Sequence, residues 1–263
     1  MFERQRRYPT DLTDAEGDVV RPLLPPPAGR GRPPEVDGRE VLKGIRYLAR
    51  AGCSWRMLPV HFGPWQTVSW GFRRLVRCLL LRTVHDIALM LDRERAGRDA
   101  SPSAGVLDSQ TVKAPAAPGG GGYDAAKRVK GRKRPVAVDT DGRLRRVKLT
   151  TADVQDAAGA ERIIGTIRQR GPWLRHLFAE GAYDRGRRMS KAACRDFVIE
   201  VVRKLTGQRG FHLLPRRGVV ERTFGWMMRW RRLVRDHEQR FDVSEALIHV
   251  ARGGLLLRRV AHP

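Results

Sequence analysis

The 263-residue sequence is poor in cysteine and has no long apolar run. Its three cysteines, Cys53, Cys78 and Cys194, are far apart and show no Cys-x-x-Cys spacing, so neither a disulfide framework nor a zinc site is indicated. A signal peptide is missing, and no stretch is apolar and long enough for a transmembrane helix. We therefore expect a protein of the reducing cytoplasm with no membrane partner.

Acidic residues are scarce relative to basic ones. The chain has 52 Lys and Arg against 28 Asp and Glu, a formal net charge of +24 that is spread over its whole length. Such a charge favours a polyanionic partner, either a membrane surface or a nucleic acid, and tryptophans among the arginines favour the nucleic acid. The length suits one large domain or two modest ones, and we expect two.

Capping signals mark two helix starts in the first third of the chain. Thr13 with Glu16, and Asp37 with Glu40, have the spacing of capping boxes. The first helix must be short because Pro22 follows it. The second is followed by apolar residues at helical spacing and is predicted as a longer amphipathic helix.

A further amphipathic helix is predicted from Pro64 to Leu79, with an exposed side that holds Arg73, Arg74 and Arg77. A helix, a turn and an arginine-bearing helix suit DNA docking, but the same arrangement occurs in ordinary helical bundles, and both interpretations stay open. Three tryptophans of this region are expected to pack among the helices rather than stack on bases: Trp55, Trp65 and Trp70.

A polar stretch over residues 93–103, which contains Gly97 and Pro102, indicates a domain boundary. We therefore predict a small all-helical, DNA-binding N-terminal domain at residues 1–95 and a second domain at residues 96–263.

Two acids of the second domain lie in or directly after predicted strands. Gly105–Val112 reads as a strand with Asp108 embedded in it. A buried, unpaired carboxylate costs several kcal/mol, so Asp108 needs a cation, a hydrogen-bond network or water, unless it lies at a solvated strand end. A second apolar strand, residues 173–179, is followed by Glu180, at the strand end where open α/β sheets bind ligands.

The elements around these acids follow a recognisable order. Asp141 and Gly142 join two β-type runs and predict a hairpin, and Asp156–Arg170 has the spacing of an amphipathic helix. Residues 215–235 predict a last helix with one apolar side and one basic side, and Glu221 is its single acid. The full predicted order is strand, hairpin, helix, strand, helix, strand, helix, so the fold class is α/β, a ribonuclease H-like mixed sheet flanked by helices.

A glycine-rich segment, residues 119–122, precedes a run of basic residues. It is not a phosphate-binding P-loop, because the Gly-Lys-Ser/Thr ending is missing. We interpret it as a flexible insertion that contacts the DNA backbone, with a disordered surface loop as an equal alternative. The residues that would make this contact are Lys130, Arg132, Lys133 and Arg134.

Several ordered motifs resemble the transposases of bacterial insertion sequences, in particular the insertion-sequence-five family. The resemblance runs from Tyr8 to about Ala261, so it covers nearly the whole chain. The matching blocks are Tyr8–Thr13, Gly52–Pro59, Asp108–Gln110, Lys130–Arg134, Ala152–Asp156 and Val219–Phe224.

The resemblance implies a catalytic triad of two aspartates and a glutamate (DDE) on a ribonuclease H-like domain. Asp108, Glu180 and Glu221 take the three acidic places and would hold Mg²⁺, with Mn²⁺ as a substitute, while Arg217 and Arg222 would position phosphate. The implied reaction is strand cleavage and transfer on double-stranded DNA, at the terminal inverted repeats and the target. We expect a homodimer on DNA, associated with the nucleoid.

The sequence departs from the family pattern at several positions. Glu180 stands where relatives carry aspartate, and its longer side chain predicts misplaced metal and impaired activity. Gly17 and Gly218 replace common tryptophans, and Gly253-Gly254 is expected to interrupt a helix. The alternative is a catalytically inactive, degenerate or domesticated DNA-binding protein. A nuclease that hydrolyses without strand transfer is a further, weaker alternative.

Overall fold

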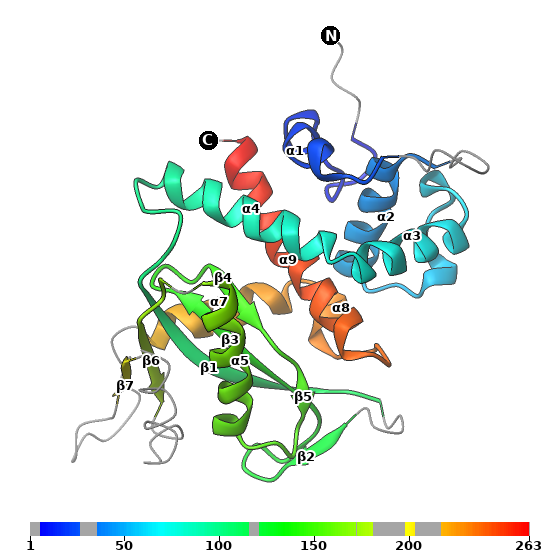
Figure 1. Cartoon of the computed structure of the whole chain (residues 1–263). Coiled ribbons are helices and arrows are strands. Elements are labelled where there is room, and N and C mark those ends of the chain that lie inside the picture. Colours follow the sequence, from blue (N-terminus) through cyan, green and yellow to red (C-terminus); the bar gives the residue numbers. More distant parts are fainter. Residues whose placement is uncertain are drawn as a thin grey trace. The chain divides into compact units, whose positions relative to one another are not determined.

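The computed structural model describes residues 6–26, 36–115, 121–171, 173–180, 198–202 and 217–262. The chain forms two compact units (Figure 1). The N-terminal unit comprises Met1–Ala100, Arg229–Val234 and Asp242–Pro263, and the sheet unit comprises Ser101–Met228 and Arg235–Phe241. The C-terminal helix therefore belongs with the N-terminal helices and not with the sheet. The assignment of DNA binding to residues 1–95 and of catalysis to residues 96–263 stays a prediction.

The described part of the N-terminal unit is all helical, with three additional single-turn 3₁₀ helices. None of the described helices is both long enough and apolar enough to cross a membrane. The α-helices are α1 (Asp14–Val20), α2 (Gly38–Ala51), α3 (Trp65–Arg77), α4 (Leu80–Arg95), α8 (Arg231–Val234) and α9 (Phe241–Ala261).

The two predicted capping boxes have different outcomes. The box at α1 is confirmed, because Thr13 Oγ1 accepts the Glu16 N–H at 3.0 Å and the Glu16 carboxylate accepts the Thr13 N–H at 3.2 Å. The box at α2 is wrong. Asp37 makes no side-chain cap there, and the Glu40 carboxylate instead accepts from Lys43 at 2.8 Å and from Arg7.

Local backbone and packing explain two further differences in this unit. The predicted helix to Leu79 ends at Arg77, because Leu79 has a positive φ of 58° and α4 begins at Leu80. The expected interruption of the last helix is wrong. Gly253 and Gly254 lie buried within the continuous α9, and a Cβ added at either glycine would lie 3.5 Å from its nearest neighbouring atom.

The described residues of the sheet unit form a seven-stranded mixed sheet, which confirms the predicted fold class. The strand order is β2-β3-β1-β6-β7, and β4 and β5 both pair with β3. The β1–β3 pair is antiparallel, and the β1–β6 and β6–β7 pairs are parallel. The strands are β1 (Ala104–Lys113), β2 (Gly122–Asp124), β3 (Val129–Asp139), β4 (Leu144–Val147), β5 (Thr150–Thr151), β6 (His176–Glu180) and β7 (Val198–Val202).

Helix α5 (Asp156–Arg170) covers one face of this sheet. Its residues Ile163 and Ile167 pack in a buried cluster with Leu107 of β1 and Leu177 of β6. Helix α7 (Arg217–Met228) also packs against β1, and Figure 1 shows it behind the sheet with α5 in front.

The predicted hairpin after β3 is confirmed, and it places α7. Asp139 is buried and its carboxylate accepts the N–H groups of Asp141 and Arg143, so this acid completes the turn. Gly142 has a φ of 85°, and a Cβ there would lie 3.0 Å from Thr223 Oγ1 of α7. Glycine is therefore required both by the turn and by the close approach of the helix.

The helix predicted over residues 215–235 is divided in the structure. Helix α7 ends at Met228 and α8 begins at Arg231. The apolar side predicted for the first part is confirmed by the burial of Val220 and Met227, whereas Val234 in α8 is 42% exposed.

Candidate active site and DNA-facing residues

Asp108 lies in the middle of β1, on the face of the sheet opposite to α5. Its neighbour Leu107 packs in the α5 cluster, and successive strand residues point to opposite faces. The Asp108 side chain is partly exposed, and its Oδ1 accepts the N–H of Ser109 at 2.7 Å. A carboxylate in this position is oriented by the backbone and still reaches solvent.

Glu180 is the last residue of β6, next to β1 in the sheet. The two strands are parallel, and Val106 pairs with Phe178. The same register, continued by two residues, brings the backbone of Glu180 level with that of Asp108. The side chain of Glu180 lies outside the described residues, so the structure supports only the alignment of the two backbone positions.

Glu221 lies on the first half of α7 and is exposed to solvent. The helix is held to the β3–β4 hairpin by Thr223, whose Oγ1 donates to the Gly142 carbonyl at 2.7 Å. Arg222 adds a contact of 3.3 Å to the Asp141 carbonyl. The elements that carry Glu221 and Asp108 are therefore packed together, because α7 also contacts β1.

The three predicted acids offer carboxylate oxygens, which suit a hard divalent cation such as Mg²⁺ or Mn²⁺. Among the described residues, no group of three or more His, Cys, Asp or Glu side chains is assembled as a metal site. The Glu180 side chain is not among the described residues, so this finding does not bear on the triad. The donor chemistry and the strand register fit a divalent metal.

The basic residues that follow the glycine-rich segment lie differently from their prediction. The insertion was predicted to be flexible and to contact DNA, but its second half is part of strand β3. Arg132, Lys133 and Arg134 are at most 6% exposed, so they do not present their charges to a DNA backbone in this structure. Lys130 precedes them and is exposed.

Buried acids and carbonyl groups explain why these cations lie inside the protein. Arg132 pairs with Asp236 at 3.1 Å, donates to the Gln239 carbonyl at 2.8 Å, and lies over the ring of Phe241. Burial lowers the pKa of Arg134 to about 10, although the charge of Asp236 counteracts this effect. The three cations had been predicted from local composition, which does not show that acids far along the chain neutralise them.

The other predicted DNA contacts remain accessible where they are described. Arg73 and Arg77 on α3 are exposed and Arg74 is partly exposed. Arg222 is exposed and lies over the Trp226 ring at 5.4 Å. The side chain of Arg217 falls outside the described residues.

Two parts of the chain match models of known protein families. A family model described as "Transposase DDE domain" matches residues 99–252, which is more than half of the chain. This chain belongs to that family. A second family model, described as "Putative transposase of IS4/5 family", matches residues 12–85. Searches of curated proteins and of solved structures find no match.

Membership of the DDE transposase family confirms the resemblance and gives the protein its general function, DNA transposition. The family performs nuclease or transferase chemistry on DNA and generally uses divalent metal ions. Assignment of this chemistry to individual residues is a separate step.

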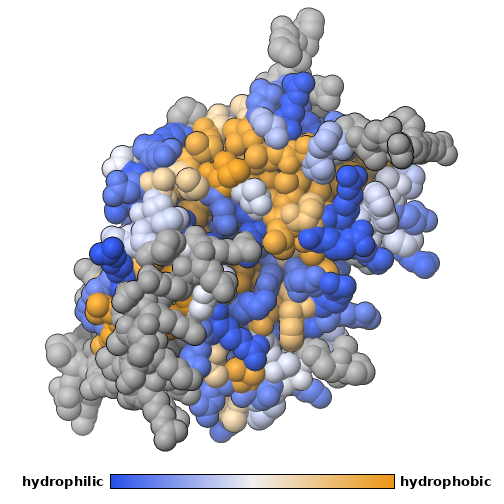
Figure 2. Space-filling view, in the orientation of Figure 1, coloured by the Kyte–Doolittle hydropathy of each residue, from blue (hydrophilic) through white to orange (hydrophobic). Residues whose placement is uncertain are grey.

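One exposed aromatic residue was not expected. Trp70 had been predicted to pack among the helices, but it is 60% exposed. It is three residues before Arg73 and seven before Arg77, so all three lie on one side of α3. The helical spacing of Trp70 relative to these arginines could have indicated its exposure from the sequence alone. Figure 2 shows a broad apolar area over the helices of the N-terminal unit.

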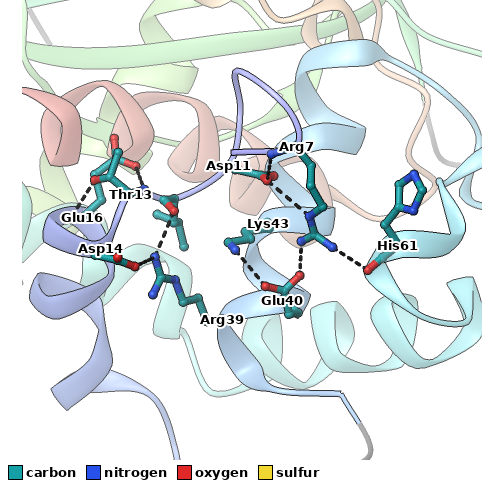
Figure 3. A network of polar contacts seen from close by, with 10 residues as sticks. Arg7, Asp11, Thr13, Asp14, Glu16, Arg39, Glu40, Lys43 and His61 are labelled. Carbon is teal, nitrogen blue, oxygen red and sulfur yellow. Dashed lines mark hydrogen bonds and ion pairs between the residues drawn. The ribbon is translucent and has the colours of Figure 1, made fainter. Parts of the chain in front are cut away.

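Several acids of the N-terminal unit are paired with basic residues of the same unit (Figure 3). Arg7 binds Asp11 and Glu40, and Arg39 pairs with Asp14 at 2.7 Å. A further pair, between Arg46 and Glu16 at 2.9 Å, is buried. Helix α3 itself contains no acidic residue, so its positive charge is not offset within the helix.

Proposed function

We propose that this chain cleaves and joins DNA at the ends of an insertion sequence, with Asp108, Glu180 and Glu221 as its metal-holding acids. The observation that carries the proposal is the β1–β6 register, which pairs Val106 with Phe178 and, continued by two residues, brings Asp108 level with the acid that ends the neighbouring parallel strand. Packing of α7 against β1 adds the helix that carries Glu221. The order of strand, strand end and helix is the one that the resemblance to insertion-sequence transposases implies.

The acids have distinct roles in this proposal. Asp108 presents a carboxylate that is oriented by the Ser109 N–H, and Glu221 approaches from an exposed helix. Asp108, Glu180 and Glu221 would hold Mg²⁺, or Mn²⁺ in its place, which would supply Lewis-acid chemistry at the phosphate. Water is the first nucleophile and the freed 3′ hydroxyl is the second. No side chain forms a covalent bond to DNA.

Exposed basic residues hold the DNA. Arg222, with Arg217 before it on α7, would position the phosphate near the acids, and Lys130 would contact the backbone. The side of α3 that carries Arg73, Arg74 and Arg77 would bind duplex DNA, with Trp70 in the same contact. Strand transfer joins two ends, so the active form would be a homodimer.

The test is Mg²⁺- or Mn²⁺-dependent nicking of plasmid DNA that carries the element's terminal inverted repeats. Glu221→Gln removes a charge that holds metal, and we expect cleavage to fall roughly a thousandfold, because such a charge contributes several kcal/mol in the transition state. Glu94→Gln, at an exposed position on α4, is the matched control and should cleave normally. Equal cleavage by wild type and Glu221→Gln would show that the site is wrongly assigned.

The alternative function is DNA binding without catalysis, and Glu180 is the observation that favours it. A glutamate is one methylene longer than aspartate, and Mg²⁺ tolerates little change in ligand geometry. Glu180→Asp should raise the cleavage rate if this length impairs the site. Tight, strongly salt-dependent binding without cleavage by either protein, at any Mg²⁺ or Mn²⁺ concentration, would support the inactive alternative.

A further inference from the structure

Ser109, directly after Asp108, uses all three of its polar groups in hydrogen bonds to charged side chains. Its N–H donates to Asp108 Oδ1 at 2.7 Å, its hydroxyl donates to Asp156 Oδ1 at 2.5 Å, and its carbonyl accepts from Lys127 Nζ at 3.1 Å. Ser109 is 6% exposed. Its hydroxyl lies on the α5 side of the sheet while Asp108 lies on the other side.

Side chains hold the backbone of β1 at Ser109 in addition to strand pairing. Ser109 stands opposite Pro135 of β3, whose carbonyl accepts the Lys148 N–H at 3.2 Å, so the backbone groups of Pro135 face away from β1. The Ser109 N–H is directed to the carboxylate of Asp108, and Lys127 supplies a donor to the Ser109 carbonyl. The backbone next to Asp108 is therefore positioned by Asp156 and Lys127 in addition to the strand pairing.

The first turn of α5 lies close enough to the sheet for Asp156 to accept the hydrogen bond from the Ser109 hydroxyl. A Cβ on Gly159 would lie 2.7 Å from Pro135 Cγ, so only glycine permits this approach. Asp156 at the start of the helix is also paired with Lys133 at 3.3 Å, and Lys133 donates to the Val154 carbonyl at 2.9 Å. The acceptor for the Ser109 hydroxyl is thus itself fixed by a buried cation of β3.

We infer that Ser109 and Asp156 are positioning residues that orient the Asp108 carboxylate for a divalent cation from the opposite face of the sheet. The inference rests on the proposed function of Asp108. In this arrangement, neither Ser109 nor Asp156 contacts the metal or the DNA. Because supporting hydrogen bonds of this kind typically change metal affinity by about 10–100-fold, their loss should appear in metal binding itself.

The strand offers a matched control two residues further on. Thr111 lies on the same side as Ser109, and its hydroxyl donates to Asp124 Oδ2 at 2.7 Å. Thr111→Val therefore removes a hydroxyl-to-carboxylate bond from the same strand, away from Asp108. A purely structural role for Ser109 would make Ser109→Ala and Thr111→Val behave alike.

The experiment measures Mn²⁺ affinity of the full chain without DNA, by electron paramagnetic resonance, together with the melting temperature. We expect about tenfold weaker Mn²⁺ binding at the Asp108-dependent site for Ser109→Ala, less than threefold change for Ser109→Thr, and no change for Thr111→Val. In nicking assays, Ser109→Ala should need correspondingly more Mn²⁺ and regain its rate at saturation.

Asp108→Asn separates the two possible failures. If it loses Mn²⁺ binding while Ser109→Ala binds as wild type does, the positioning role is wrong and the proposed site stands. If Asp108→Asn also binds as wild type does, the proposed site and the positioning role both fail. Equal weakening of Mn²⁺ binding by Ser109→Ala and Thr111→Val would likewise overturn the positioning role.

Discussion

Helix α3 of the N-terminal unit and strand β3 of the sheet unit place their basic side chains in opposite ways. In the N-terminal unit, acids such as Asp14 and Glu40 are occupied by basic partners, and α3 presents Arg73 and Arg77 to solvent. In the sheet unit, three cations of β3 are buried, and Glu221 is exposed. The first arrangement suits a surface that binds phosphate, and the second suits a site that binds metal. Net charge alone does not show this difference.

The largest expected effect comes from breaking a buried pair in the sheet unit. Asp236→Asn would leave Arg132 buried next to a neutral group, and we expect a loss of about 3–5 kcal/mol in the free energy of unfolding. Asp14→Asn breaks the Arg39 pair, in which the acid is 43% exposed, and should cost less than about 1 kcal/mol. Urea unfolding measures both. Similar losses of unfolding free energy in the two variants would contradict the difference between the buried Arg132–Asp236 pair and the more exposed Arg39–Asp14 pair.

A second comparison uses two glycines in helices of the sheet unit. Gly159→Ala would place a methyl group against Pro135 and should cost about 1–3 kcal/mol. Gly225→Ala on α7 meets nothing within 4 Å and should stabilise by up to about 1 kcal/mol, because alanine favours the helix. Melting temperatures of the two variants should therefore shift in opposite directions. A stabilised Gly159→Ala variant would show that α5 is less closely packed than the structure indicates.

A third prediction separates exposed from buried cations by salt dependence. Replacing Arg73 and Arg77 by alanine should lower the slope of log affinity for DNA against log salt by about 2, with little change in stability. Arg95→Ala, at an exposed position on α4, is the control and should leave the slope unchanged. Lys133→Met should reduce stability and leave the slope unchanged, since Lys133 is buried. A lower slope for Lys133→Met would show that this lysine reaches DNA.

The smallest expected effect is a difference in acid sensitivity. Burial by itself would raise the pKa of Glu40, but bonds from Lys43 and Arg7 outweigh it and lower the pKa below 4.5. For Asp124, bonds from Thr111 and the Lys127 N–H and the Lys133 charge likewise overcome burial and lower the pKa below 3.8.

Both carboxylates therefore stabilise the fold in their ionised form at neutral pH, and this stabilisation is lost as the pH falls through each folded pKa. Stability measured from pH 7 down to about pH 3 should fall less steeply in Glu40→Gln and in Asp124→Asn than in wild type. Because the ordinary pKa of Glu40 is the higher one, its contribution should begin to decline at higher pH. Parallel profiles for wild type and both variants would contradict these assignments.

Sequence patterns predicted the elements well where the signal is local. The helix Asp156–Arg170, the strand around Asp108 and the Asp-Gly hairpin are all present. The capping box at Asp37 was wrong because Glu40 bonds instead to Arg7, a residue outside the helix. The break at Leu79 was missed because apolar spacing continues across a single residue of positive φ.

By itself, the sequence determined the family, the fold class and the identity of the three candidate acids, since these depend on motifs and on periodicity along short stretches. Only the tertiary structure decided which cations are buried, which strand residue lies level with Asp108, and what Ser109 contacts. The physical reason is that alternation along a strand assigns a side chain to a face. The partner on that face comes from strand register and helix packing between distant segments.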